Sequence, residues 1–77
     1  MSKLLVIKAR ELVTFLLRMG FVQHRKMKGS HLVVKHNDGR RTTIPMHSRD
    51  IPTGTLMAIL KDIKISKEHF LTHFNKS

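Results

Sequence analysis

The chain has 77 residues, of which 40% are hydrophobic, so we expect one core and a single domain over residues 1–77. It contains no cysteine, which excludes disulfide bonds and thiolate metal sites. Fifteen Lys and Arg stand against five Asp and Glu, a formal net charge of +10. A folded domain this basic attracts polyanions, so nucleic acid is the favoured partner. An acidic protein partner or a merely solvated surface is the alternative.

The sequence predicts a protein of the cytoplasm. The apolar run at residues 4–7 is followed at once by charged residues, so we expect no signal peptide. No stretch approaches the roughly 18 apolar residues of a membrane-spanning helix, so we expect no membrane contact. The lack of cysteine fits a reducing compartment.

A short extended segment at residues 4–7 is expected to lead into a helix over residues 8–19. One helical face of that stretch is apolar and consists of Ala9, Leu12, Val13, Leu16 and Leu17. Gly20 follows the last of these residues, at the place where a left-handed residue commonly ends a helix. Phe15 lies off the centre of the apolar stripe, so we expect it to be partly exposed.

Three strands are expected next, over residues 21–27, 31–36 and 40–46. The first two are joined by Lys28-Gly29-Ser30, a predicted tight turn or bulge. The last two are joined by Asn37-Asp38-Gly39, which is typical of a hairpin with Gly39 in the left-handed conformation. Pro45 cannot donate a backbone hydrogen bond, so it belongs at a sheet edge or a strand end.

Side chains alternate between the two faces of a strand, which sorts these residues into two sets. The core-facing set is expected to be Leu32 and Val34, with Thr42, Ile44 and Met46 sharing one face of the third strand. The opposite set is then His31, Val33, Lys35, Arg41 and Thr43. One open face can therefore carry His31, Lys35 and Arg41, although the strand register is not determined by the pattern.

The remainder of the chain predicts a loop over residues 47–52, a helix from about residue 53 or 54 to 63, and a short helix over 67–74. Thr53 and Ser66 are the expected helix caps. The apolar residues of the two helices are Leu56, Ile59, Leu60 and Ile63, then Phe70, Leu71 and Phe74. This order predicts an α+β fold. It would be a two-layer sandwich in which helices cover one face of a three-stranded antiparallel sheet.

Metal and phosphate-loop chemistry receive little support. The chain has six histidines but no HxH or HExxH spacing, and the pair His69 and His73 is more typical of a helix surface than of a metal site. No phosphate-loop motif is present. Gly54 and Thr55 open a helix, and with Arg49 nearby that helix start can hold one phosphate or can be a plain helix start.

RNA cleavage without a metal requires only a base and cations. The base removes the proton of a ribose 2′-OH, the oxygen attacks the adjacent phosphorus, and cations stabilise the developing charge. His31 is the candidate base, because histidine exchanges protons near neutral pH, and Lys28 and Lys35 are candidate phosphate ligands. Gly29 would let a phosphate approach the backbone. These residues alone favour a surface or RNA-contacting histidine over a catalytic one.

A wider set of spaced motifs resembles the HicA toxin family of bacterial toxin–antitoxin systems. The resemblance covers roughly residues 5–74 in the same order. It rests on Gly20-Phe21, Lys28-Gly29-Ser30-His31, His36-Asn37-Asp38-Gly39-Arg40-Arg41, Ile44-Pro45-Met46-His47, Gly54-Thr55-Leu56, Ile59-Leu60 and Ile65-Ser66. Family members often have a small or polar residue as a helix cap where Ala9 stands. Ala9 departs from them because an alanine side chain cannot cap a helix.

The resemblance implies the α-β-β-β-α fold of double-stranded RNA-binding domains. It implies the toxin of a type II system, a metal-independent mRNA endoribonuclease that arrests translation and has no cofactor. His31 is then the catalytic base, with Gly29 and Ser30 as the residues that position it. The partner implied is a HicB-type antitoxin that forms a hetero-oligomer and occludes His31. His47 is a second candidate, as proton donor or RNA contact.

The full set of candidate RNA contacts is Lys28, Lys35, Arg41, His47, Arg49, Gly54 and Thr55. Two other functions stay open. A non-catalytic RNA-binding module of the same fold fits the charge equally well, and so does an adaptor that binds an acidic protein.

Overall fold

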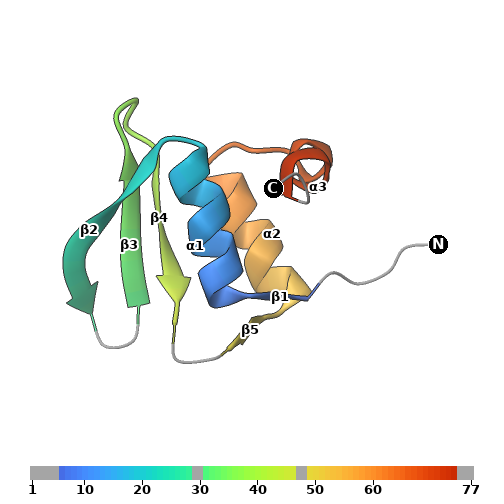
Figure 1. Ribbon diagram of the computed structural model, residues 1–77, viewed down its shortest axis with the longest axis horizontal. Helices are drawn as coiled ribbons and strands as arrows, with labels where there is room; N and C mark the ends of the chain where they lie inside the picture. The colour runs from blue at the N-terminus through green and yellow to red at the C-terminus, as the bar shows by residue number, and fades with distance from the viewer. Residues whose placement is uncertain (1–5, 29–30, 47–48, 75–77) are drawn as a thin grey trace.

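The fold is described from a computed structural model covering residues 6–28, 31–46 and 49–74, the side chains of residues 25–28 excepted. The elements are β1 (Ile7–Lys8), α1 (Ala9–Arg18), β2 (Phe21–Lys28), β3 (His31–His36), β4 (Arg41–Pro45), β5 (Asp50–Ile51), α2 (Thr53–Asp62) and α3 (Lys67–Phe74). Figure 1 shows α1 and α2 packed on one face of the sheet formed by β2, β3 and β4. The predicted α+β sandwich, with the α-β-β-β-α order, is confirmed.

The three-stranded sheet is antiparallel, with β3 in the centre and β4 at one edge. Its register places Phe21 opposite His36 and Lys35 opposite Arg41. The pairing of β2 with β3 shifts between His24 and Met27, where the strand carries a bulge or irregularity. Pro45 ends the edge strand, as its missing amide hydrogen predicts.

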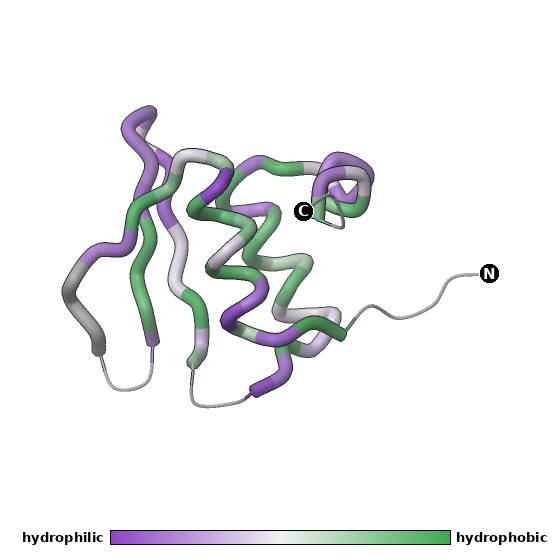
Figure 2. The backbone as a smooth tube through the Cα atoms, viewed as in Figure 1, coloured by the Kyte–Doolittle hydropathy of each residue, from purple (hydrophilic) through white to green (hydrophobic). Residues whose placement is uncertain are grey.

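The core lies between the sheet and the two long helices. The buried face of the sheet is formed by Leu32, Val34, Thr42 and Ile44, so the predicted alternation is confirmed. The expected stripe of α2 is also buried. Figure 2 shows hydrophobic segments along β3 and in both long helices, while the turn between β3 and β4 is hydrophilic. Within the described parts of the chain, no helix is long and apolar enough to cross a membrane.

The apolar stripe of α1 is rotated relative to the one expected from its periodicity. Phe15 was expected to be partly exposed, but it is 2% exposed, whereas Leu17, assigned to the stripe, is 41% exposed. The reason is α3, which covers the Phe15 side of the helix. The Phe15 ring meets those of Phe70 and Phe74 at 4.9 and 6.1 Å between centroids, in edge-to-face geometry. Leu71 of α3 is exposed, so only part of its expected apolar side is buried.

Two short strands pair outside the main sheet. The expectation of a loop over residues 47–52 is wrong for Asp50 and Ile51, which form β5 and pair antiparallel with β1. Ile7 lies opposite Ile51, and both side chains are buried. Strands of only two residues can form here because the buried side chains of Ile7 and Ile51 hold them against the core. The pair joins the start of α1 to the start of α2.

Of the two expected helix caps, Ser66 is confirmed and Thr53 is wrong. Pro52 is the N-cap of α2 and Thr53 lies inside the helix, so Thr53 is not the cap. The N-cap of α1 is Lys8, whose ammonium has no acceptor for a helix amide. Its backbone N–H instead donates to Glu11 Oε1 at 3.1 Å. Ser66 does cap α3, since its Oγ accepts the His69 N–H at 3.0 Å.

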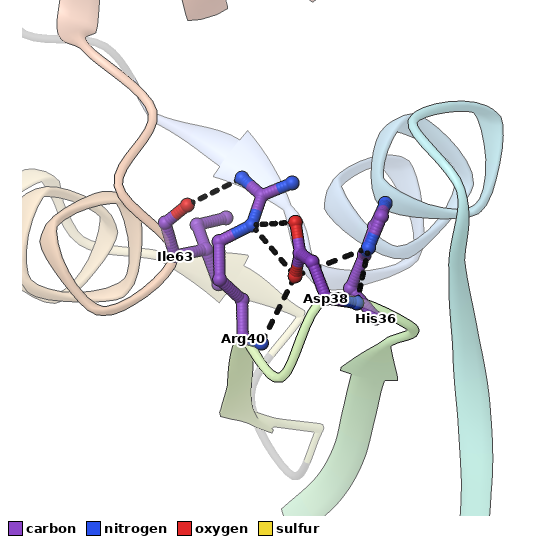
Figure 3. A network of polar contacts seen from close by, with 4 residues as sticks. All are labelled: His36, Asp38, Arg40 and Ile63. Carbon is purple, nitrogen blue, oxygen red and sulfur yellow. Dashed lines mark hydrogen bonds and ion pairs between the residues drawn. The ribbon is translucent and has the colours of Figure 1, made fainter.

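Arg40 ties the turn between β3 and β4 to the end of α2 (Figure 3). Its Nε donates to Asp38 Oδ2 at 2.9 Å, and its Nη1 donates to the Ile63 carbonyl at 2.7 Å. Ile63 is the C-cap of α2, where carbonyls lack helical partners and a cation is favourable. The guanidinium also lies 5.1 Å from the centre of the Phe21 ring. One side chain therefore connects the hairpin, β2 and the helix layer.

Asp38 organises the turn itself. Its Oδ1 accepts the Arg40 backbone N–H at 3.1 Å and lies 3.1 Å from His36 Nδ1. The pKa of this carboxyl is lowered, first by the Arg40 amide that donates to it and then by the paired guanidinium. Gly39 follows with a φ of +100°, the left-handed conformation that the Asn-Asp-Gly run predicted.

Truncating Phe15 tests the docking of α3. Phe15→Ala should lower the free energy of unfolding by about 3–5 kcal/mol, because it removes a buried ring and leaves a cavity beneath Phe70. Urea denaturation followed by circular dichroism measures this change. Leu17→Ala in the same helix is the control, with an expected loss under about 1 kcal/mol. Equal losses for the two variants would contradict the rotated stripe.

Replacing Asp38 tests the electrostatics of the turn. A carboxyl whose pKa is lower in the folded state stabilises the fold above its unfolded pKa, about 3.9. That stabilisation is lost as the pH falls through the folded pKa. Asp38→Asn should therefore be less stable than wild type at pH 7, with a smaller decline in stability below about pH 4. Urea titrations between pH 2 and 7 measure both effects.

Glu68→Gln is the matched control for that experiment, because it removes one negative charge from an exposed acid on α3. If Asp38→Asn kept the wild-type dependence of stability on pH, the carboxylate would not contribute through its pKa.

Candidate nucleic-acid interface

His31 is the first residue of β3 and is exposed. The register places it between Lys28 of β2 and Pro45 of β4, at one end of the sheet. Its neighbour Leu32 is buried under the helices, so alternation directs His31 to the open face. The histidine is thus held by the central strand and faces away from the helix layer.

Two cations face each other farther along the same open face. Lys35 lies directly opposite Arg41, and neither side chain is part of the buried core. Like charges in directly opposed positions destabilise a sheet, and a bound anion removes that cost. The pair is therefore suited to an anionic ligand.

The structure separates this cation pair from His31. Lys35 lies four residue positions beyond His31 along β3, which is about 13 Å at roughly 3.3 Å per residue. A phosphate beside His31 is consequently not the phosphate that Lys35 and Arg41 would hold. The pair can instead contact a neighbouring phosphate of the same polyanion.

Apolar and neutral side chains complete the open face between the two ends. Val33 lies between His24 of β2 and Thr43 of β4, and Val22 lies beside Lys35. Val22 is 61% exposed. The face therefore combines cations with an apolar strip.

Arg49 lies beside the start of α1. Its carbonyl accepts the Ala9 N–H at 2.9 Å. Among the described residues, Lys8, Arg10, Ala9 and Met46 line with it a groove of about 530 Å³. Gly54 and Thr55 are the second and third residues of α2, where helix amides lack helical partners.

Lys8 and Arg10 were missed as candidates in the sequence. Each is an exposed residue flanking the buried Ala9, and each lines the groove. The sequence did contain one indication of their role, because both cations fall on the polar side of the first helical turn. Their partner Arg49 is distant in sequence, and only the pairing of β1 with β5 brings it close.

Several candidates lie outside the described residues. Gly29, Ser30 and His47 are among them, and so is the side chain of Lys28. The roles assigned to these residues stay predictions.

The histidine pair of α3 forms no larger metal-ligand cluster in the described regions. The rings of His69 and His73 stack at 4.2 Å between centroids, and His73 Nδ1 lies 3.0 Å from the His69 carbonyl oxygen. Across residues 6–28, 31–46 and 49–74, no three His, Asp or Glu side chains are close enough to share an ion.

Comparison with known proteins identifies the family. A family model described as the HicA toxin of bacterial toxin–antitoxin systems matches residues 9–65. The matched segment runs from α1 through the three-stranded sheet and α2 and includes His31, while α3 lies outside it. A search of curated proteins found no match. Because the family model covers most of the chain, the resemblance seen in the sequence is confirmed, and the protein belongs to the HicA family of toxins from bacterial toxin–antitoxin systems.

Proposed function

We propose that this HicA-family toxin is a metal-independent mRNA endoribonuclease that arrests translation in the cytoplasm, with His31 as the general base. Membership of the family makes it the toxin of a toxin–antitoxin system, with an antitoxin partner. The observation that carries the proposal is the placement of His31. It is an exposed histidine on a sheet whose open face also carries Lys35 and Arg41.

The proposed reaction needs one base and one proton donor. The His31 imidazole accepts the proton of the ribose 2′-OH, and the 2′ oxygen forms a bond to the adjacent phosphorus. The bond from phosphorus to the 5′ oxygen breaks, and that oxygen takes up a proton from water or from His47. The products are a 2′,3′-cyclic phosphate and a 5′-hydroxyl end. The step consumes no cofactor.

The cations have separate roles in this proposal. Lys28, Gly29 and Ser30 adjoin His31 in sequence and are the candidates for contact with the reacting phosphate. Lys35 and Arg41 lie about 13 Å along the strand, so they hold the RNA backbone and do not stabilise the transition state directly. They should therefore affect affinity more than the rate of the bound complex.

The antitoxin is proposed to cover this same face. A HicB-type partner that shields His31 would also meet the exposed Val22 and the opposed cations of the sheet. An apolar residue among cations suits a protein partner with acidic and apolar side chains. Binding of the antitoxin and binding of RNA would then exclude each other.

A non-catalytic RNA-binding module is the second candidate, because the cationic face supports RNA binding whether or not His31 acts as a base. The two functions differ only in whether the RNA is cut.

Removal of the imidazole tests the proposed base. Wild-type protein should cut RNA in EDTA and leave cyclic phosphate ends. His31→Ala should reduce the cleavage rate by about 10²–10⁴-fold, the usual contribution of a general base. Expression of the wild type should arrest growth, and His31→Ala should relieve the arrest. His69→Ala removes an exposed histidine on α3 and should leave cleavage unchanged.

Cleavage that survives His31→Ala would show that His31 is not the base. RNA binding without any cleavage by the wild type would favour the non-catalytic module.

Neutralising the opposed cations tests the binding face. The double variant Lys35→Gln, Arg41→Gln should bind RNA more weakly. The slope of log affinity against log salt should fall by about 1.4, because two phosphate contacts are lost from single-stranded RNA. Fluorescence anisotropy on a His31→Ala background measures binding without cleavage. The double variant Lys61→Gln, Lys67→Gln removes the same charge from exposed helix positions. An equal loss in both double variants would contradict a localised site.

A further inference from the structure

The groove at the start of α1 gathers three cations from separate parts of the chain. Lys8 ends β1, Arg10 belongs to the first turn of α1, and Arg49 directly precedes β5. The described lining contains these cations with Ala9 and Met46, and no acid. Their proximity is therefore a product of the fold.

The backbone around the groove is held in place by hydrogen bonds. The Ala9 N–H donates to the Arg49 carbonyl at 2.9 Å, and β1 pairs with β5 beside it. Two acids lie close by, since Lys8 is opposite Asp50 and its N–H donates to Glu11. Neither acid lines the groove. The groove thus presents a cationic surface on a fixed frame.

The groove adjoins the end of the sheet where His31 lies. Met46, which lines the groove, directly follows Pro45, and Pro45 is opposite His31. Paired Cα atoms on neighbouring strands lie about 5 Å apart, and the next residue along the chain adds about 4 Å. The Cα atoms of His31 and Met46 are therefore within roughly 10 Å of each other. Figure 1 shows the start of β3, the end of β4 and the start of α1 at the same end of the molecule.

Cations consequently lie on two sides of His31. Lys35 and Arg41 lie along the open face, and the groove lies beyond the opposite end of the strand. An RNA backbone that passes His31 from the open face would have to bend around the end of β4 to reach the groove. A single strand can follow that path more readily than a stiff duplex, and cationic grooves commonly track single-stranded backbones.

We infer that the groove lined by Lys8, Arg10 and Arg49 binds phosphates of a single-stranded RNA segment that flanks the scissile bond. This inference rests on the proposed function, because the flank is defined by the position of His31. It adds that the substrate is single-stranded beside the cut and that α1 takes part in binding it.

The test neutralises the groove and compares two forms of RNA. The double variant Arg10→Gln, Arg49→Gln on a His31→Ala background is titrated with a labelled single-stranded RNA and with the same sequence as a duplex. The Kd for the single strand should rise about tenfold near physiological salt, and the salt slope should fall by about 1.4. The loss for the duplex should not exceed that of Lys61→Gln, Lys67→Gln, which removes equal charge elsewhere.

The same variant with His31 intact separates binding from chemistry. We expect the KM for a single-stranded substrate to rise about tenfold while kcat changes far less, because the groove contacts the flank and not the reacting atoms. Arg49→Gln alone, checked for folding by its urea midpoint, should show an intermediate rise in Kd. It keeps the backbone carbonyl that accepts the Ala9 N–H.

The outcomes distinguish this inference from the proposed function. If His31→Ala abolishes cleavage but the groove variant binds single-stranded RNA like wild type, the groove is not a binding site and the catalytic proposal stands. If wild type never cuts RNA but the groove variant loses affinity for single strands, the groove stands as a binding site for single-stranded RNA, while the catalytic proposal and the link to a scissile bond fail. Equal losses for duplex and single strand, or for groove and control variants, overturn the inference.

Discussion

The burial of one face of β3 determines the arrangement of everything else. Leu32 and Val34 enter the core beneath α1 and α2, and the strict alternation of a strand then directs His31 and Lys35 to the other side. A slip of one residue would bury a histidine and a lysine and expose two apolar side chains. The hydrophobic free energy of the core therefore also keeps the candidate base on the open face.

Arg40 fixes the third strand in this arrangement. Its hydrogen bond to the Ile63 carbonyl and its ion pair with Asp38 connect the hairpin turn to the helix layer. The turn sets the pairing of β3 with β4, and this register brings Lys35 opposite Arg41. An interaction far from His31 thus decides which cations share the face with it. The same side chain stabilises the fold and positions part of the proposed RNA surface.

The sequence pattern predicted those features of the fold that depend on interactions between residues close together in the chain. The alternation in β3, the Asn-Asp-Gly turn and the stripe of α2 depend on neighbours in sequence, and all three were predicted. The burial of Phe15 depends on α3, which docks from more than fifty residues away, so the periodicity of α1 assigned Leu17 in its place. β1 and β5 are too short for a pattern and exist because Ile7 and Ile51 reach the core. The groove of Lys8, Arg10 and Arg49 follows from that pairing, so it was found only in the fold.

The net charge of +10 has an energetic cost for so small a domain. Self-repulsion destabilises a compact state, and opposing Lys35 with Arg41 adds to that cost locally. Clustered cations are costly while the protein is free and favourable once a polyanion neutralises them. Lys35 and Arg41 lie on the open face and Lys8, Arg10 and Arg49 line the groove, while His31 lies between the two near the strand end. In the proposed function, affinity and chemistry then depend on different residues, and substitution is expected to weaken either property without removing the other.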